Sequence, residues 1–193
     1  MIKTMSELTV QGKRVLVRQD LNVPLRDGQV ASTARIDAAL PTIEALLGQG
    51  ARVAVMSHSG RPKEGMCEPE FSLAPVAKIM SRKLGRHVPL ITDWIDGFEQ
   101  TDDLVLLENV RYLRGEKQNN EALARKMASL CDIYLMDAFG TAHRAHASTC
   151  VACMRHAEQA HAPPQAHCPR RPAPSCGCGA ASAARTRRSH PGP

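Results

Sequence analysis

Polar and basic residues recur in this sequence directly after short runs of apolar residues. Four stretches show the pattern: QDLNVP (19–24), SHSGRP (57–62), ENVRY (108–112) and DAFGTAHRAH (137–146). Three of them carry arginine, whose guanidinium group matches the paired oxygens of phosphates and carboxylates. Asp20 and Asn22 in the first stretch suit hydroxyl groups. The combination favours a ligand that is small, anionic and hydroxylated.

The apolar runs that precede these stretches are typical of buried strands. They are RVLVR (14–18), ARVAVM (51–56), DLVLL (103–107) and DIYLM (132–136). None alternates cleanly with polar residues, which indicates a sheet that is covered on both faces. Apolar residues at helical spacing lie between them, at 34–50, 72–86 and 119–130. Ser72 and Asn120 are expected to cap the second and third helices, and Gly85 to end the second.

This succession of strands and helices predicts the fold class. We expect an α/β domain with three layers, doubly wound around a mainly parallel, Rossmann-like sheet. Right-handed crossovers then place every loop that follows a strand at one edge of the sheet. Ligands bind at that edge in such folds. Arg35, at the start of the first predicted helix, adds its charge to the positive end of the helix dipole.

The composition changes near residue 150. Residues 151–193 contain six Arg, no Lys and one Glu, so they carry +5 of the formal net charge of +6. They contain no Leu, Ile, Phe, Tyr or Trp, and such a segment cannot bury enough surface to offset its ordering entropy. We therefore predict a folded domain over 1–149 and a disordered Ala/Pro/Arg/His/Cys tail over 150–193. The basic pI of 9.1 comes from the tail, so nucleic-acid binding is disfavoured.

Other classes of protein are disfavoured as well. No apolar stretch approaches the roughly 18 residues that span a bilayer, and MIKTMSELTV has no apolar core of a secretory signal. The wide spacing of the cysteines in the first 150 residues favours a reducing cytoplasm. GRPKEGMC (60–67) lacks the Gly-Lys-Ser/Thr ending of a P-loop, and no G-x-G-x-x-G follows a strand. The chain therefore shows no nucleotide-binding fingerprint.

The tail allows one alternative, a zinc site. Its candidate ligands are Cys150, Cys153, His156, His161, His167 and Cys168. A structural zinc site needs ligands held by turns or by a small apolar core. Neither signal surrounds these residues, so we expect no metal there.

Taken together, the motifs resemble the phosphoglycerate kinase family. RVLVRQDLNVP (14–24), ARIDAALPTIEALLGQGARVAVMSHSGRP (34–62), FSLAPVA (71–77), LLENVRY (106–112), GEK (115–117) and DAFGTAHRAHAST (137–149) follow in the family's order. The resemblance implies a cytoplasmic, monomeric glycolytic enzyme. It implies reversible phosphoryl transfer between 1,3-bisphosphoglycerate and ADP, giving 3-phosphoglycerate and ATP, with Mg²⁺. It also implies two doubly wound domains, one for phosphoglycerate and one for the nucleotide.

The resemblance assigns roles to single residues. Asp20 and Asn22 are expected to bind the glycerate part, and the phosphate is expected to lie among His58, Arg61, Arg111 and Arg144. Arg35 is the expected catalytic residue, which stabilises the phosphoryl group in transfer. Leu21, Ser59 and Gly60 complete the expected substrate-binding set.

The family's nucleotide domain has no counterpart in this sequence. We expect no metal-binding or nucleotide-binding residue in it, and an out-of-frame or truncated gene would explain the change near residue 150. The alternative function is an anion-binding domain without catalysis.

Overall fold

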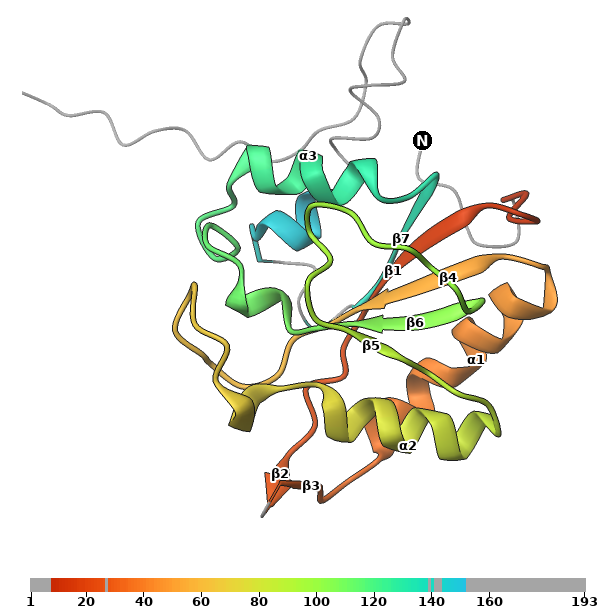
Figure 1. The fold of residues 1–193 in the computed structure, drawn as a ribbon, viewed down its shortest axis with the longest axis horizontal. Coiled ribbons are helices and arrows are strands. Elements are labelled where there is room, and N and C mark those ends of the chain that lie inside the picture. Colours follow the sequence, from red (N-terminus) through yellow and green to blue (C-terminus); the bar gives the residue numbers. More distant parts are fainter. Residues whose placement is uncertain (1–7, 27, 139, 141–143, 152–193) are drawn as a thin grey trace, which may run out of the picture.

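The computed structural model describes residues 8–26, 28–138, 140 and 144–151 of the chain. Five parallel strands form its main sheet, in the order β5-β6-β4-β1-β7 (Figure 1). They are β1 (Arg14–Gln19), β4 (Arg52–Met56), β5 (Leu90–Ile91), β6 (Leu104–Leu107) and β7 (Ile133–Asp137). A separate antiparallel pair joins β2 (Leu25–Arg26) and β3 (Gln29–Val30).

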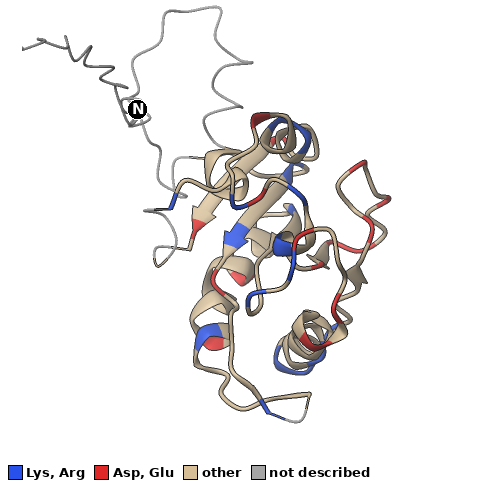
Figure 2. Cartoon of the chain, turned by 90° about the vertical axis from the view of Figure 1, so that its left-hand side faces the viewer, with Lys and Arg blue, Asp and Glu red and all other residues tan. Residues whose placement is uncertain are grey.

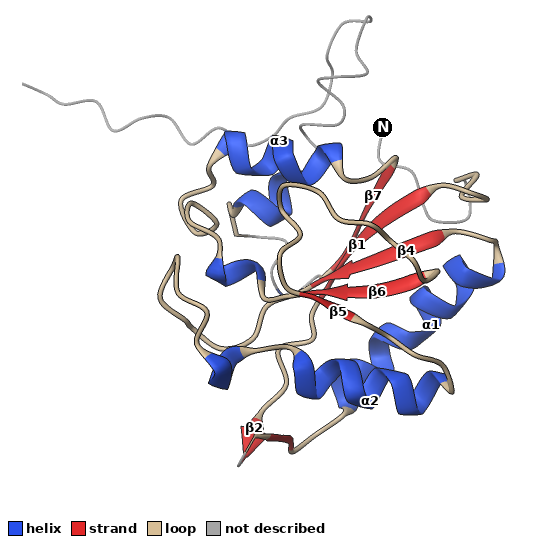
Figure 3. Cartoon of the chain, viewed as in Figure 1, coloured by secondary structure: helices blue, strands red, loops and turns tan. Residues whose placement is uncertain are grey.

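Helices cover both faces of this sheet. α1 (Ala34–Gly48) and α2 (Ala74–Leu84) lie on one face and α3 (Glu121–Ser129) on the other (Figure 3). Two short 3₁₀ helices, η2 (Pro69–Phe71) and η3 (Val110–Tyr112), lie in the connections. Within the described ranges, no helix has the length and apolar character to cross a membrane.

The strands carry apolar side chains on both faces because each face has its own core. In β1, Val15 and Val17 belong to the cluster that packs against α1 and α2, whereas Leu16 belongs to the cluster under α3. Successive side chains of a strand point to opposite faces, so Arg18 lies on the α3 side with Leu16. The predicted three-layer, mainly parallel fold is thus confirmed.

The three predicted helices and the four predicted strands are confirmed with small shifts at their ends, but the expected cap of α2 is wrong, because its N-cap residue is Leu73 and not Ser72. Asn120 caps α3, since its side chain accepts a hydrogen bond from the Leu123 amide at 3.0 Å. Gly85 ends α2 in the left-handed conformation, with φ of 61°. β5 was not predicted, because a strand of two residues leaves too short a run of apolar residues to recognise.

The sheet register brings four strand ends to one edge. Arg18 of β1 pairs with Met56 of β4, and Gln19 pairs with Asp137 of β7. Val55 of β4 in turn pairs with Leu106 of β6. The residues that follow β1, β4, β6 and β7 therefore leave the sheet side by side, as the strand-end pattern predicted.

Candidate functional site

The loops that leave β1, β4 and β6 are tied together at this edge. The Gly60 amide donates to Asn22 Oδ1 at 2.9 Å, and Asn109 Nδ2 donates to the Ser59 carbonyl at 2.8 Å. The Arg111 guanidinium donates to the Gly60 carbonyl. Seen toward this side of the molecule, Lys and Arg segments lie around the strand ends (Figure 2). The backbone of the β4 loop is thus held from both neighbours.

Gly60 is required at its position by both conformation and space. Its φ is 56°, a region that side chains disfavour. A Cβ atom there would lie 2.2 Å from the Phe71 ring. Since both polar groups of Gly60 are hydrogen-bonded, a larger residue would displace the contacts to Asn22 and Arg111.

His58 is a neutral histidine surrounded by positive charge. Its side chain is 4% exposed, and Nδ1 lies 3.1 Å from Arg18 Nη2. Arginine has only donors, so Nδ1 is the acceptor. Burial, followed by the charges of Arg18, Arg111 and Arg144, lowers the pKa of His58 to about 2. The imidazole is therefore uncharged at neutral pH.

The arginines of the site repel one another. Arg111 is buried, and its pKa is lowered first by that burial and then by the charges of Arg144 and Arg18, with a smaller effect of Arg61. Arg61 and Arg144 are exposed. A bound anion would offset this repulsion, because opposite charge favours the ionised form of each guanidinium. The electrostatics of the edge thus suit a phosphate or carboxylate.

Asp20 and Arg35 lie beside this cluster as an ion pair. Arg35 Nη1 is 2.7 Å from both carboxylate oxygens of Asp20. The Asp20 carboxylate also accepts a long hydrogen bond, of 3.4 Å, from the backbone N–H of Asn22. These three residues come from the β1 loop and the start of α1, so the fold brings them together as the sequence predicted.

Two expected site residues are packed inside the protein. The Leu21 side chain lies fully buried in the core that faces α1 and α2, and its amide donates to Ser57 Oγ at 2.9 Å. Ser59 is buried as well, and its carbonyl accepts from Asn109. Leu21 thus links the loops after β1 and β4, and Ser59 links the loops after β4 and β6.

Sequence reasoning missed the buried polar residues behind the site. Arg18 is 1% exposed, and Glu116 and Ser148 are also buried. A charged residue at the end of the buried run RVLVR was the available signal for Arg18. His143, which belongs to the fourth strand-end stretch, lies outside the described residues. So do Cys153, His156, His161, His167 and Cys168 of the alternative zinc site.

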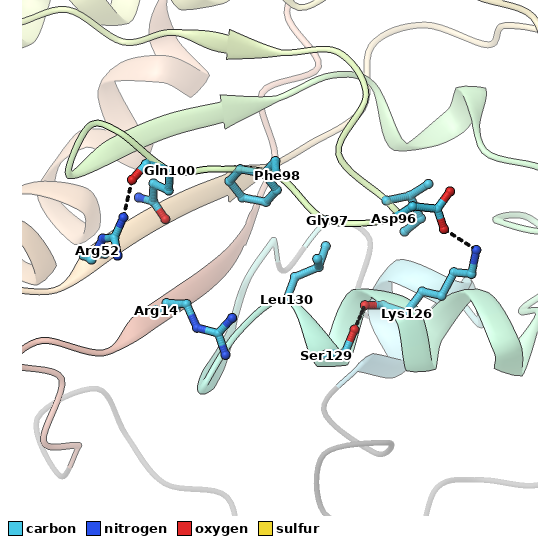
Figure 4. A pocket seen from close by; sticks show the side chains of 10 residues that line it. Arg14, Arg52, Asp96, Gly97, Phe98, Gln100, Lys126, Ser129 and Leu130 are labelled. Carbon is cyan, nitrogen blue, oxygen red and sulfur yellow. Dashed lines mark hydrogen bonds and ion pairs between the residues drawn. The ribbon is translucent and has the colours of Figure 1, made fainter.

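A hollow of about 430 Å³ lies at the opposite end of the sheet, beside the start of β1 and β4 (Figure 4). Three cations line it, and each has a partner within the protein. The pairs are Arg14 with Asp132, Lys126 with Asp96, and Arg52 with the Gln100 carbonyl. Because these charges are already paired, the hollow is a poorer anion site than the carboxyl edge, the edge of the sheet where the loops after β1, β4, β6 and β7 begin.

Comparison with known proteins finds one family, by sequence and by structure. The sequence model of the phosphoglycerate kinase family matches residues 5–161. A curated phosphoglycerate kinase from Nitratidesulfovibrio vulgaris is 62% identical over 146 residues, which are 75% of this chain and 37% of that protein. The chain thus spans well under half the length of this relative.

Solved structures show the same likeness. The phosphoglycerate kinase of Coxiella burnetii matches with a TM-score of 0.75 and 52% identity, over 78% of this chain and 39% of that one. The enzyme of Pyrococcus horikoshii matches with a TM-score of 0.68 and 28% identity, over 81% and 44%. Since the family model covers most of the sequence and the fold agrees, this chain belongs to the phosphoglycerate kinase family.

Proposed function

We propose that this chain is the phosphoglycerate-binding part of a phosphoglycerate kinase. It would hold 3-phosphoglycerate or 1,3-bisphosphoglycerate while a phosphoryl group passes to or from a nucleotide. One observation carries the proposal: Arg18 of β1, together with Arg111 and Arg144 from the loops after β6 and β7, lies around a neutral histidine at the carboxyl ends of the strands. The mutual repulsion of these cations is what an anionic substrate would relieve.

The proposed contacts follow the placement of the side chains. Arg61, Arg111 and Arg144 are proposed to bind the phosphate with charge-assisted hydrogen bonds. Asp20 and Asn22 are proposed to bind the glycerate part. Leu21, His58, Ser59 and Gly60 line or support the same edge.

Arg35 is the proposed catalytic residue. Its guanidinium, at the start of α1, would stabilise the oxygens of the phosphoryl group in transfer. Its exposed side chain and its position beside Asp20 support this role, because the group in transfer must face a second substrate.

The described residues do not fit the family's nucleotide and Mg²⁺. They contain no group of three His, Cys, Asp or Glu residues that could hold a metal ion. The sequence contains no P-loop and no G-x-G-x-x-G after a strand. No step involving ADP, ATP or Mg²⁺ is therefore assigned to residues of this chain.

An anion-binding domain without catalysis remains the alternative function, and assays of turnover and binding separate the two.

We propose a cytoplasmic monomer that binds neither membranes nor nucleic acid. The support comes from the sequence: residues 151–193 carry +5 of the net charge of +6, so the first 150 residues are close to neutral, and their cysteines are widely spaced.

A titration of the 193-residue chain with 3-phosphoglycerate tests the proposal. Calorimetry is expected to show saturable binding that inorganic sulfate competes away. Glycerate is the matched control, because it lacks only the phosphate and should bind far more weakly. The Arg52→Ala variant, changed at the opposite end of the sheet, should bind like the unchanged chain. Absence of saturable binding by the folded chain would overturn the assignment.

A further inference from the structure

Glu116 is a buried carboxyl group that lies outside the proposed set of ligand contacts. It is 1% exposed and lies in the loop between η3 and α3. Ser148 donates to it twice, from Oγ to Oε1 at 2.5 Å and from its amide to Oε2 at 2.9 Å. The Glu116 carbonyl accepts from the Ala147 amide at 2.9 Å. Glu116 therefore fastens the segment that carries Arg144 and His146.

The same hydroxyl continues the network toward the site. Ser148 Oγ accepts from Arg18 Nε at 3.2 Å, and Arg18 Nη2 donates to His58 Nδ1 at 3.1 Å. All four residues are buried. An unbroken chain of hydrogen bonds thus runs from Glu116 through Ser148 and Arg18 to His58. Buried networks of this kind fix the orientation of their members.

The network decides which ring nitrogen of His58 carries the proton. Since Nδ1 accepts from Arg18, the hydrogen of the neutral imidazole is on Nε2. Among the described residues, His58 makes no second side-chain hydrogen bond, and no buried side-chain nitrogen or oxygen there lacks a partner. The Nε2–H group therefore reaches the surface. It is available there as a donor at the carboxyl edge.

We propose that Glu116 is a positioning residue for this site: through Ser148 and Arg18 it holds His58 with Nε2–H available to a bound anion, and it holds the segment bearing Arg144. The identity of that anion rests on the proposed function, whereas the orientation of His58 does not. The groups that face His58 are Arg18, Arg111, Arg144 and His146. All are cationic or neutral, so none would favour a protonated His58.

A simpler role for Glu116, as a counter-charge to the arginines, makes the opposite prediction. A carboxylate near an anion site repels the ligand, so removing its charge should strengthen binding. A positioning role requires that the same change weakens binding. The sign of the effect of Glu116→Gln on affinity therefore separates the two roles.

The first experiment needs no ligand. ¹⁵N NMR of the histidine-labelled 193-residue chain should show a protonated Nε2 and an unprotonated Nδ1 for His58, unchanged between pH 8 and pH 5. The His58→Gln variant assigns the signal. Ser148→Ala and Glu116→Gln should each produce mixed tautomers or titration in this range. Glu44→Gln, an exposed change on α1, should leave the signal unchanged. An unaltered His58 signal in both network variants would overturn the proposal.

The second experiment measures 3-phosphoglycerate binding by calorimetry. Glu116→Gln and Ser148→Ala should each raise Kd by about three- to tenfold, the effect of one hydrogen bond. The double variant should be little worse than either single variant, because the two residues act in one network. Unchanged or tighter binding by Glu116→Gln would show that the carboxylate is only a counter-charge.

The two experiments can fail separately. If the unchanged chain does not bind 3-phosphoglycerate, the proposed function is wrong, and the NMR measurement alone decides the role of Glu116. Fluorescence of Trp94, a buried residue and the sole tryptophan of the sequence, reports whether each variant is folded. Ser148→Ala keeps the carboxylate and removes one hydroxyl, so it carries the test if Glu116→Gln does not fold.

Discussion

Arg35 and Asp20 are paired through one guanidinium nitrogen, Nη1, which lies 2.7 Å from both oxygens of the carboxylate. Both side chains are partly exposed, at 49% and 26%. An exposed pair of this kind contributes less than about 1 kcal/mol to stability, so a ligand can separate it easily. A glycerate hydroxyl that donates to Asp20 would compete directly with Arg35, which couples substrate binding to release of the proposed catalytic residue.

Replacing Arg35 by Ala should therefore affect 3-phosphoglycerate binding little. The proposed partner of Arg35 is the phosphoryl group in transfer, which this ligand lacks, and loss of the ion pair frees Asp20. We expect a change in Kd below about threefold and a loss of stability below about 1 kcal/mol. Calorimetry and urea unfolding followed by Trp94 fluorescence measure the two quantities. A tenfold loss of affinity would place Arg35 in the ground-state complex instead.

Replacing Arg144 by Ala should weaken the same binding by roughly ten- to a hundredfold. Arg144 is exposed and has no ion-pair partner within the described part of the chain. A charge-assisted hydrogen bond contributes on the order of 1.5–3 kcal/mol, and the expected factor follows from that. Arg82→Ala, an exposed arginine on α2, is the matched control. Equal affinities of the two variants would remove Arg144 from the site.

Sequence and structure agree most closely where a local pattern decides the outcome. The apolar runs predicted four of the five main-sheet strands, and the rule for parallel crossovers then predicted that their ends meet. Arg18 was missed because it ends an apolar run and its partner is remote in the sequence. Ser148, which fixes its orientation, lies 130 residues away in the sequence. No short-range pattern carries such a contact.

The loops of the site are partly buried. Loops usually run over the surface of a protein, but His58, Ser59 and Arg111 are buried. The reason is a set of hydrogen bonds with the backbone of the β4 loop, in which Asn22 accepts and Asn109 and Arg111 donate. These bonds draw the loops against one another, and hydrophobic periodicity contains no information about them.

The 193-residue chain by itself should make no ATP from 1,3-bisphosphoglycerate and ADP. Its described residues contain no group of three His, Cys, Asp or Glu residues that could hold a metal ion, and the sequence has no P-loop and no G-x-G-x-x-G after a strand. Phosphoryl transfer requires both substrates held together away from water. A coupled assay that follows ATP should give the rate of a blank without protein. Turnover well above that blank, retained after rigorous purification, would show that a nucleotide site exists in this chain.

Gly60→Ala should destabilise the protein more than Gly85→Ala. Both glycines have a left-handed φ, 56° and 61°, so both changes share the conformational cost of about 1 kcal/mol. Only at Gly60 would the new Cβ meet another side chain, Phe71, at 2.2 Å. Overpacking of this kind costs roughly 1–3 kcal/mol. Urea unfolding of the two variants should differ by about that amount, whereas equal stabilities would mean that Phe71 moves aside freely.

The buried His58 should make folding sensitive to acid. Its pKa is about 2 in the folded chain and 6.5 without the fold, so between these values the unfolded chain binds a proton that the folded chain does not. Stability then falls as the pH falls below 6.5, by about 1.4 kcal/mol per pH unit at the steepest. The lowered pKa of His146, caused first by burial, acts in the same direction. Burial raises the pKa of Glu116, which acts in the opposite direction.

Comparison with His58→Gln isolates the contribution of this one residue, because His146 and Glu116 are present in both proteins. Glutamine keeps a neutral polar side chain but has no proton to gain in this range. Between pH 7 and pH 5 the unchanged chain should lose about 2 kcal/mol more than the variant. The measurement is urea unfolding at both pH values, followed by Trp94 fluorescence. Equal losses in the two proteins would mean that His58 is protonated in the folded state, and that the arginines around it do not hold it neutral.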